Sequence, residues 1–168
     1  GLLARREDGG LRDFFWGRLM FPIADRQGRV VGFGARAMDD STPKYINTAR
    51  SPVFDKSTML YALHLAAPSI REAETAVVVE GYMDVIAAPQ HGFRNVVASM
   101  GTALTERQVE RLKSMATDFV LALDPDTAGQ EATLRSLDAS WGVFQRRRVG
   151  IAQRTGGPLY QAERTNLS

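Results

Sequence analysis

The second half of the chain alternates short apolar runs with longer amphipathic segments. The run at 76–79 is wholly hydrophobic, which is typical of a strand buried on both faces of a sheet. Between the runs the patterning is helical, and Thr105 with Gln108 three residues later is a capping-box signal for a helix start. The predicted strands are 76–79, 95–99 and 119–123, and the predicted helices are 83–90, 105–115 and a last one from Asp126 or Thr127 to Leu137. This order predicts a parallel sheet covered by helices.

The first part of the chain is richer in turn residues and prolines. Two strands are predicted at 19–23 and 30–35, with a turn between them at 25–29. The other predictions here are an unpatterned lead-in at 1–17, an ordered loop at 39–52 and a helix at 58–67 that stops near Pro68. Together these elements predict a small lobe, mostly β, ahead of the parallel sheet.

Composition narrows the possible chemistry. The chain of 168 residues has no cysteine, which excludes disulfides, thiolate metal sites and a cysteine nucleophile within it. The net charge is only +2, yet residues 61–140 carry 11 acidic and 6 basic side chains, while both flanks are basic. This balance suits a metal site beside a phosphate-binding surface, although ordinary charge scatter explains it equally well.

The chain has no apolar run of membrane-spanning length and no secretory pattern at its start. We therefore expect a cytoplasmic protein without membrane association. Because the sequence starts without methionine and ends on a polar stretch, we also expect it to be a piece of a longer protein.

Acidic residues stand at the ends of two predicted strands. Glu80 directly follows 76–79, and Asp124 and Asp126 follow 119–123. Ligands of open parallel sheets bind beyond the carboxyl ends of the strands, so these carboxylates converge if the first and third strands are neighbours. Asp84, one helical turn after Glu80, can face the same place. Such oxygen ligands suit Mg²⁺ or Mn²⁺. The alternative is that the two aspartates cap a helix and Glu80 is a loop acid.

Several motifs occur in the order found in bacterial DNA primases. Residues 80–85 (EGYMDV) and 124–129 (DPDTAG) resemble the two acidic motifs of the toprim domain, and 101–105 (GTALT) matches the segment between them. Toprim domains also occur in topoisomerases, recombination mediators and nucleases, so the primase resemblance depends on the first lobe. There, four segments are similar to the first lobe of the primase catalytic core: 17–23 (GRLMFPI), 28–36 (GRVVGFGAR), 43–47 (PKYIN) and 51–57 (SPVFDKS).

The resemblance covers about residues 12–138 and implies an α/β fold. A toprim-type parallel sheet flanked by helices would follow a small N-terminal mixed α+β lobe. The implied domains are the N-terminal lobe at 1–70, the toprim domain at 71–140, and a truncated or inserted C-terminal segment at 141–168. The family has a further acidic motif downstream, but Glu163 is the only acid after Asp138. We therefore expect the first metal position to be intact and any second one to be weak.

The resemblance also implies roles for two sets of residues. Glu80, Asp124 and Asp126 would be catalytic and hold a divalent metal ion, with Asp84 as a further metal ligand. Each basic or aromatic residue of the second set could equally be an ordinary surface or packing residue. The nucleic-acid- and nucleotide-binding set is Arg18, Arg36, Lys44, Tyr45, Asn47 and Lys56.

The implied activity is DNA-directed RNA primer synthesis for DNA replication, a nucleotidyl transfer from ribonucleoside triphosphates on single-stranded DNA with Mg²⁺ or Mn²⁺. The implied partners are the template, the triphosphates and the replicative helicase, which a C-terminal domain absent from this sequence would contact. Zinc is expected only in an N-terminal domain that is also absent, and we expect a monomer. The alternatives are a toprim nuclease or topoisomerase-like domain, or a non-catalytic metal- and DNA-binding fragment. The isolated fragment can be weakly active or inactive.

Overall fold

The computed structural model describes residues 2–101, 103–123, 148–153 and 161–165. The chain forms two compact units, unit 1 at Gly1–Asp55 and unit 2 at Lys56–Ser168. No helix among the described residues is long and apolar enough to cross a membrane. The predicted domain boundaries at residues 70 and 140 stay predictions.

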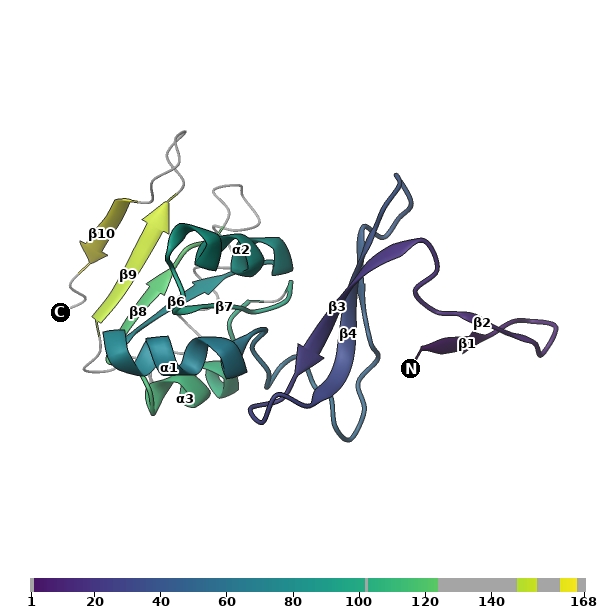
Figure 1. Ribbon diagram of the computed structural model, residues 1–168, viewed down its shortest axis with the longest axis horizontal. Helices are drawn as coiled ribbons and strands as arrows, with labels where there is room; N and C mark the ends of the chain where they lie inside the picture. Colours follow the sequence, from purple (N-terminus) through teal and green to yellow (C-terminus); the bar gives the residue numbers. More distant parts are fainter. Residues whose placement is uncertain (1, 102, 124–147, 154–160, 166–168) are drawn as a thin grey trace. The chain divides into compact units, whose positions relative to one another are not determined.

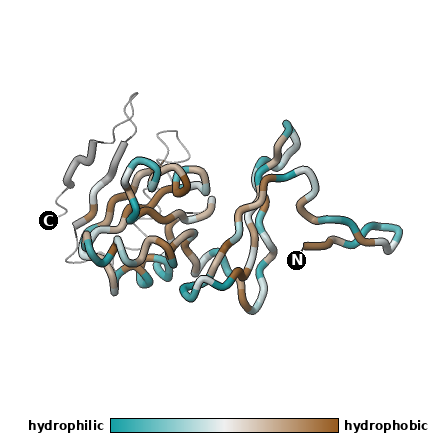
Figure 2. The backbone as a smooth tube through the Cα atoms, viewed as in Figure 1, coloured by the Kyte–Doolittle hydropathy of each residue, from teal (hydrophilic) through white to brown (hydrophobic). Residues whose placement is uncertain are grey.

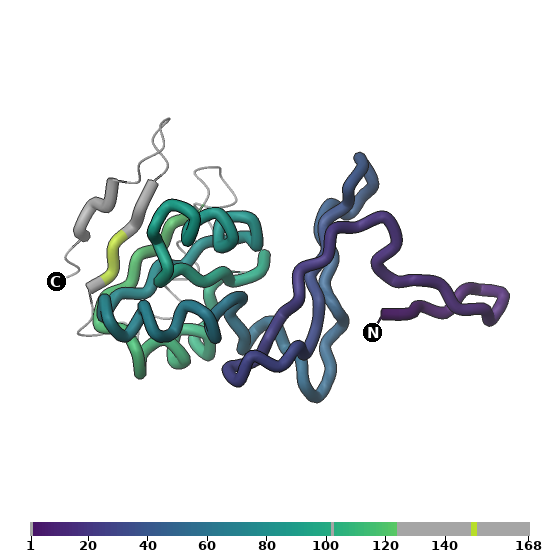
Figure 3. Tube along the Cα trace, viewed as in Figure 1, coloured from purple at the N-terminus to yellow at the C-terminus, as the bar shows by residue number. Residues whose placement is uncertain are grey.

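Unit 1 consists of two small antiparallel sheets, whose path Figures 1 and 3 trace from the N-terminus. The first is a two-stranded hairpin, and the second has three strands in the order β3-β4-β5. The strands are β1 (Leu3–Arg5), β2 (Leu11–Asp13), β3 (Arg18–Ala24), β4 (Val30–Ala37) and β5 (Tyr45–Asn47). The predicted strands at 19–23 and 30–35 are confirmed as β3 and β4. The turn between them is confirmed too, because the Asp25 carboxylate accepts hydrogen bonds from the Gln27 and Arg29 N–H groups at 2.9 and 3.0 Å.

Two sequence predictions for unit 1 are wrong. The lead-in at 1–17 contains the β1–β2 hairpin, closed by a tight turn in which the Arg6 N–H donates to the Gly10 carbonyl at 2.8 Å and Gly9 has φ +83°. The loop at 39–52 contains β5, a three-residue edge strand. These strands of three residues are too short for the period-2 alternation that reveals longer strands, and pairing with a neighbouring strand determines them.

Aromatic packing holds the three-stranded sheet of unit 1 together. Phe21 and Ile23 are buried, and Phe54 covers the sheet with 2% of its surface exposed. A Cβ built on Gly32 would lie 3.0 Å from Cδ2 of the Phe54 ring, so a glycine is needed there. The sequence GFG in β4 therefore has a packing role.

Unit 2 is built around a five-stranded sheet in the order β10-β9-β8-β6-β7. The last four strands of this order, from β9 to β7, pair in parallel, and β10 runs antiparallel to β9 at one edge. The strands are β6 (Thr75–Val79), β7 (Val96–Ala98), β8 (Asp118–Leu121), β9 (Arg148–Gln153) and β10 (Gln161–Thr165). The predicted α/β class, with a parallel sheet flanked by helices, is confirmed, and the other sheets of the chain are small and antiparallel.

Helices cover both faces of this sheet (Figure 1). On one face, α1 (Leu63–Ala73) and α3 (Glu106–Lys113) pack on Val78, Phe119 and Leu121. On the other, α2 (Tyr82–Ala87) packs through Val85 on Val79 and Ala98. Figure 2 shows hydrophobic colour along the central strands of unit 2. Alternate strand residues thus enter two different cores, which explains why the strands are continuously apolar in sequence.

Two of the helix predictions are confirmed. The Thr105 hydroxyl accepts from the Gln108 N–H at 3.2 Å, and the Gln108 side chain accepts from the Thr105 N–H at 2.9 Å, so the capping box forms. The predicted helix at 83–90 is α2 continued by a 3₁₀ turn, η1 (Ala88–His91), and it ends at Gly92 with φ +90°. The predicted helix after residue 126 lies outside the described residues.

The helix predicted at 58–67 is wrong in its bounds. Helix α1 starts at Leu63 and passes through Pro68 to Ala73. An interior proline costs a helix about 3 kcal/mol because it removes a hydrogen bond and crowds the preceding turn. Here Pro68 is exposed, whereas Leu63, Ala66 and Ile70 are buried against the sheet. The buried face of α1 outweighs the local breaker signal.

Candidate functional site

The carboxyl edge of the parallel sheet brings Glu80 to a central position. Strand β6 lies between β7 and β8, which confirms that the first and third predicted strands are neighbours. The β6–β8 register pairs Val78 with Leu121, and the Ala122 N–H donates to the Val78 carbonyl at 2.9 Å. Glu80, directly after β6 and half-buried, therefore stands at the edge where the chain leaves β8 toward Asp124.

The backbone after β7 is fixed against Glu80. The Ser99 N–H donates to the Val79 carbonyl at 3.2 Å, and the Gly101 N–H donates to the Glu80 carbonyl at 3.4 Å. Met100 and Gly101 have φ +62° and +78°. Left-handed conformation is ordinary for glycine but strained for the buried Met100. Nothing in the sequence indicates the strain at Met100.

Asp84 lies in the first turn of α2 and folds back toward Glu80. Its Oδ2 accepts a hydrogen bond from the Gly81 N–H at 3.3 Å. A Cβ added to Gly81 would lie 3.1 Å from that same oxygen, so glycine at this position leaves room for the carboxylate. The structure thus places the Asp84 carboxylate beside the residue that follows Glu80, and Asp84 stays exposed.

A pair of tyrosines packs behind this acidic turn. The rings of Tyr61 and Tyr82 meet edge to face with centroids 4.7 Å apart. Burial raises the pKa of Tyr82 well above its usual range, and the neighbouring Tyr61 raises it further. Tyr82 therefore stays protonated and adds no negative charge beside Glu80. Sequence reasoning gave Tyr82 no role, although it stands inside the EGYMDV motif.

The structure describes only two of the four carboxylates that were predicted to converge, Glu80 and Asp84. Asp124 and Asp126 lie outside the described residues. Among the residues that the structure does describe, no group of three or more His, Cys, Asp or Glu side chains could hold a metal ion. The donors at this edge, Glu80 and Asp84, are carboxylates, the ligand type that fits a hard divalent ion. The four-residue metal set stays a prediction.

The predicted nucleic-acid-binding residues of unit 1 gather on the three-stranded sheet. Arg36 of β4 is paired in register with Tyr45 of β5, and its guanidinium lies 6.0 Å from the centre of the Tyr45 ring. Asn47, two residues after Tyr45, shares its face of the strand and is paired with Gly34. Because the motifs GFGAR and PKYIN become cross-strand neighbours, Arg36, Tyr45 and Asn47 form one surface.

Arg18 and the two lysines are placed differently. A terminal nitrogen of Arg18 donates to the carbonyls of Pro43 and Lys44 at 2.8 and 3.4 Å, so Arg18 holds the segment that leads into β5. The Lys44 side chain is exposed beside Tyr45. Lys56 belongs to unit 2, where its carbonyl accepts a hydrogen bond from the Gln108 side chain at 2.9 Å. The direct role of Arg18 in this structure is to position Lys44.

Two family models match the chain in succession. The first, "DNA primase catalytic core, N-terminal domain", matches residues 1–67, and the second, "Toprim domain", matches residues 74–150. Among curated relatives, a DNA primase of Deinococcus radiodurans is 49% identical over 145 residues, which is 85% of this chain and 25% of the relative. A DNA primase of Clostridium acetobutylicum is 46% identical over 138 residues, which is 82% of this chain and 23% of the relative. The chain thus spans about a quarter of the length of these relatives.

Solved structures agree with these matches. A DNA primase domain from Pseudomonas aeruginosa superposes with a TM-score of 0.85 at 40% identity, covering 92% of this chain and 49% of that one. The Escherichia coli primase catalytic core gives a TM-score of 0.85 at 36% identity, with coverages of 94% and 50%. A DnaG primase catalytic domain bound to single-stranded DNA gives 0.83 at 35% identity, with coverages of 92% and 50%. These matches agree with the sequence motifs and with the parallel sheet that has Glu80 at its carboxyl edge. The chain belongs to the family of DNA primase catalytic cores with a toprim domain.

Proposed function

We propose that this chain is the template- and metal-binding part of an enzyme that makes RNA primers on single-stranded DNA for replication. The observation that carries the proposal is Glu80 at the carboxyl end of the central strand β6, next to the strand that leads to Asp124 and Asp126. A relative whose structure holds single-stranded DNA at 35% identity supports the template part of the proposal. The proposed reaction is attack of a ribonucleotide 3′-hydroxyl on the α-phosphate of an incoming ribonucleoside triphosphate, and pyrophosphate leaves.

The carboxylates would hold the divalent ion that this chemistry needs. We propose Glu80, Asp124 and Asp126 as the principal ligands and Asp84 as a further one, with Mg²⁺ or Mn²⁺ as the ion, because the donor set is all oxygen. When bound, such an ion supplies positive charge for the phosphates and lowers the pKa of the attacking hydroxyl. The hydrogen bond from Gly81 to Asp84 keeps the Asp84 carboxylate near Glu80 before an ion arrives.

The surface of unit 1 would hold the template. Arg36 can contact phosphate while its guanidinium stays near the Tyr45 ring, and the exposed part of that ring can stack face to face with a base. Arg18 would act indirectly, because its hydrogen bonds to the Pro43 and Lys44 carbonyls fix the backbone on both sides of Lys44. Asn47 can donate to a nucleotide from the same face. Lys56, which belongs to unit 2, is proposed as a phosphate contact of that unit. Phosphate contacts of this kind give salt-sensitive binding that tolerates any sequence.

Further parts of the proposal concern the longer relatives. We propose that the protein works as a monomer in the cytoplasm, and that contact with the replicative helicase and binding of zinc belong to regions beyond the segment matched here. The chain covers about a quarter of the curated relatives, so these regions need the full-length protein for a test.

The proposed function is tested with Asp124→Ala in the full chain. Labelled ribonucleotide incorporation on single-stranded DNA should fall to background, whereas DNA affinity and the melting temperature stay as in the parent chain. Mn²⁺ affinity, measured by the electron paramagnetic resonance of the free ion, should fall in parallel and gives a readout if the parent is weakly active. Unchanged incorporation or unchanged Mn²⁺ binding by the variant would contradict the assignment, and DNA cleavage without incorporation would indicate a toprim nuclease instead.

A further inference from the structure

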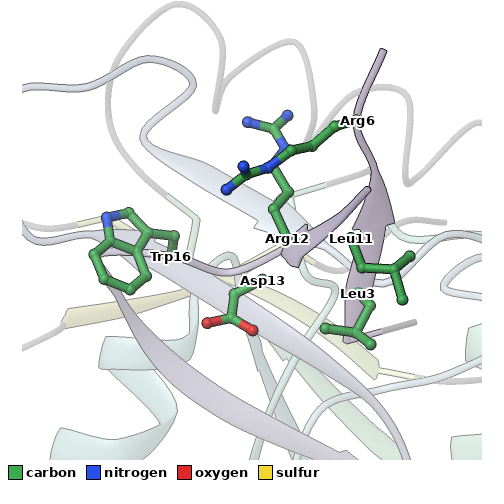
Figure 4. A pocket seen from close by; sticks show the side chains of 6 residues that line it. All are labelled: Leu3, Arg6, Leu11, Arg12, Asp13 and Trp16. Atoms are coloured by element: carbon green, nitrogen blue, oxygen red, sulfur yellow. The ribbon is translucent and has the colours of Figure 1, made fainter. Parts of the chain in front are cut away.

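The basic residues of the chain differ in how firmly their backbone is held. In unit 1, Arg6 and Arg12 extend from the β1–β2 hairpin beside an open hollow (Figure 4). This hairpin is a sheet of two strands that pairs with no other strand among the described residues. Lys56, in contrast, begins a short segment, residues 56–59, whose carbonyls accept hydrogen bonds from side chains at the start of α3. The backbone of Lys56 is therefore tied to the core of unit 2.

Three carbonyl groups of this segment converge on the capping box of α3. The Thr105 hydroxyl donates to the Ser57 carbonyl at 2.6 Å. The Gln108 amide donates to the Lys56 and Met59 carbonyls at 2.9 and 2.8 Å. The same two side chains close the capping box, so each of them both starts the helix and binds the segment.

Gln108 is an unusual residue for its place in the core. It shares the buried face of α3 with Val109 and Leu112, where an apolar side chain would be ordinary, and none of its surface is exposed. Both N–H groups of its amide donate to carbonyls, and its oxygen accepts from the Thr105 N–H. A polar network that is satisfied inside a core of low dielectric favours one arrangement of its members. The network therefore gives the segment one backbone position.

The connection between β7 and α3 is also held to the strand end that carries Glu80. The Gly101 N–H donates to the Glu80 carbonyl at 3.4 Å. Just before this connection, Ala98 pairs with Tyr61 through both backbone groups, at 2.9 and 3.3 Å. Hydrogen bonds near the two ends of one connection thus reach the proposed metal ligand and the segment that begins with Lys56.

We propose that Thr105 and Gln108 are positioning residues for Lys56, which hold it where its ammonium binds a phosphate of the incoming ribonucleoside triphosphate. The Lys56 side chain is exposed, and no acid among the described residues forms an ion pair with it. A lysine has a flexible stem, so a fixed backbone reduces the freedom that is lost when the ammonium binds. The inference rests on the proposed function, in which Lys56 is a phosphate contact, and names the residues that place this contact.

The test is a double-mutant cycle on the affinity of the full chain for fluorescently labelled GTP in Mn²⁺, measured by anisotropy. Lys56→Ala should weaken binding about tenfold, as expected for loss of a charged hydrogen bond. Thr105→Val, which lacks the donor hydroxyl, should weaken binding about fivefold, whereas Thr105→Ser should bind like the parent. In the Lys56→Ala background, Thr105→Val should cause no further loss, because its effect passes through Lys56.

Two further variants separate positioning from stability. Thr117→Val removes a hydroxyl that donates to the Glu74 carbonyl at 3.3 Å in the same unit, and it should bind labelled GTP like the parent. Gln108→Met removes both amide donors to the segment and should weaken binding as Thr105→Val does. Thermal unfolding of every variant sets a temperature at which all are folded. If Gln108→Met does not fold, the two Thr105 variants decide alone.

The outcomes distinguish this proposal from the proposed function. Parent-like affinity of Thr105→Val, or a further loss in the double variant, would overturn the positioning role, while a loss in Lys56→Ala alone would still support the phosphate contact. Parent-like affinity of Lys56→Ala would overturn both the contact and its positioning, and would leave the metal site to the incorporation assay with Asp124→Ala. If the parent chain does not bind labelled GTP, both proposals fail.

Discussion

Units 1 and 2 differ in where their polar residues lie. In unit 2 the parallel sheet is covered by helices on both faces, and the proposed metal ligand Glu80 lies at its carboxyl edge. In unit 1 the small antiparallel sheets leave Arg36, Tyr45 and Trp16 accessible on their surfaces. Under the proposed function, the metal ligands would have a rigid, buried support, whereas the phosphate-binding residues would lie on an open surface that tolerates any sequence. Core substitutions in unit 2 should therefore affect stability, and surface substitutions in unit 1 should affect affinity for the template.

The largest effect on stability is expected from Phe119→Ala in β8. The ring is 1% exposed in the core between the sheet and α1 with α3, so its loss should lower the free energy of unfolding by about 3–5 kcal/mol. Urea denaturation followed by circular dichroism measures the change. The matched control is Phe93→Ala, at a side chain that is 56% exposed, with an expected change below about 1 kcal/mol. Equal losses in both variants would show that the core of unit 2 is not where we place it.

A somewhat smaller effect is expected from Gln108→Ala on α3. Gln108 is fully buried, and its side chain donates to the Lys56 and Met59 carbonyls at 2.9 and 2.8 Å. Leaving these groups unsatisfied should lower the free energy of unfolding by about 2–3 kcal/mol. Gln27→Ala, in the exposed β3–β4 turn of unit 1, should change stability by less than about 0.5 kcal/mol in the same denaturation experiment. A neutral Gln108→Ala would mean that the 56–59 segment is not held by α3.

Arg36→Ala should change stability least and should clearly weaken the binding of single-stranded DNA. The stability should change by less than about 0.5 kcal/mol, because the guanidinium only covers the exposed Tyr45 ring. Affinity for single-stranded DNA should fall about fivefold at low salt, with a salt slope that is lower by about 0.7. Anisotropy titrations across salt concentrations measure both values, with Arg107→Ala as the control. An unchanged slope would remove Arg36 from the phosphate contacts.

The two units also differ in how well the sequence predicted them. Buried strands and the Thr105–Gln108 cap were recognisable because their signals are local and strong. The hairpin at 3–13 and strand β5 were missed because each of these strands has only three residues and depends on pairing with the strand next to it. Pro68 gave a misleading stop signal because the buried face of α1 outweighs it.

The sequence predicted the residue types of the proposed sites but not most of the contacts that these residues make. The sequence placed Glu80 at a strand end, but whether β6 and β8 are neighbours was left open, and the strand order settles it. The contact of Arg36 with Tyr45 needed the β4–β5 register, and the support that Arg18 gives to Lys44 needed the tertiary structure. The exposure of Trp16 was hidden because sequence alone does not tell which of three successive aromatic residues turns inward.

The central claim, a metal site at the carboxyl edge of β6, is tested most directly by Mn²⁺ titration of the ¹⁵N-labelled chain. Amide signals of Gly81, Asp84 and Gly101 surround Glu80 and should broaden first, while those of unit 1, such as Gly34, stay sharp. Glu80→Gln should shift this selective broadening to much higher Mn²⁺ concentration, and Glu110→Gln, at an exposed acid of α3, should leave it unchanged. Broadening that avoids the three signals, or that survives unaltered in Glu80→Gln, would contradict the account.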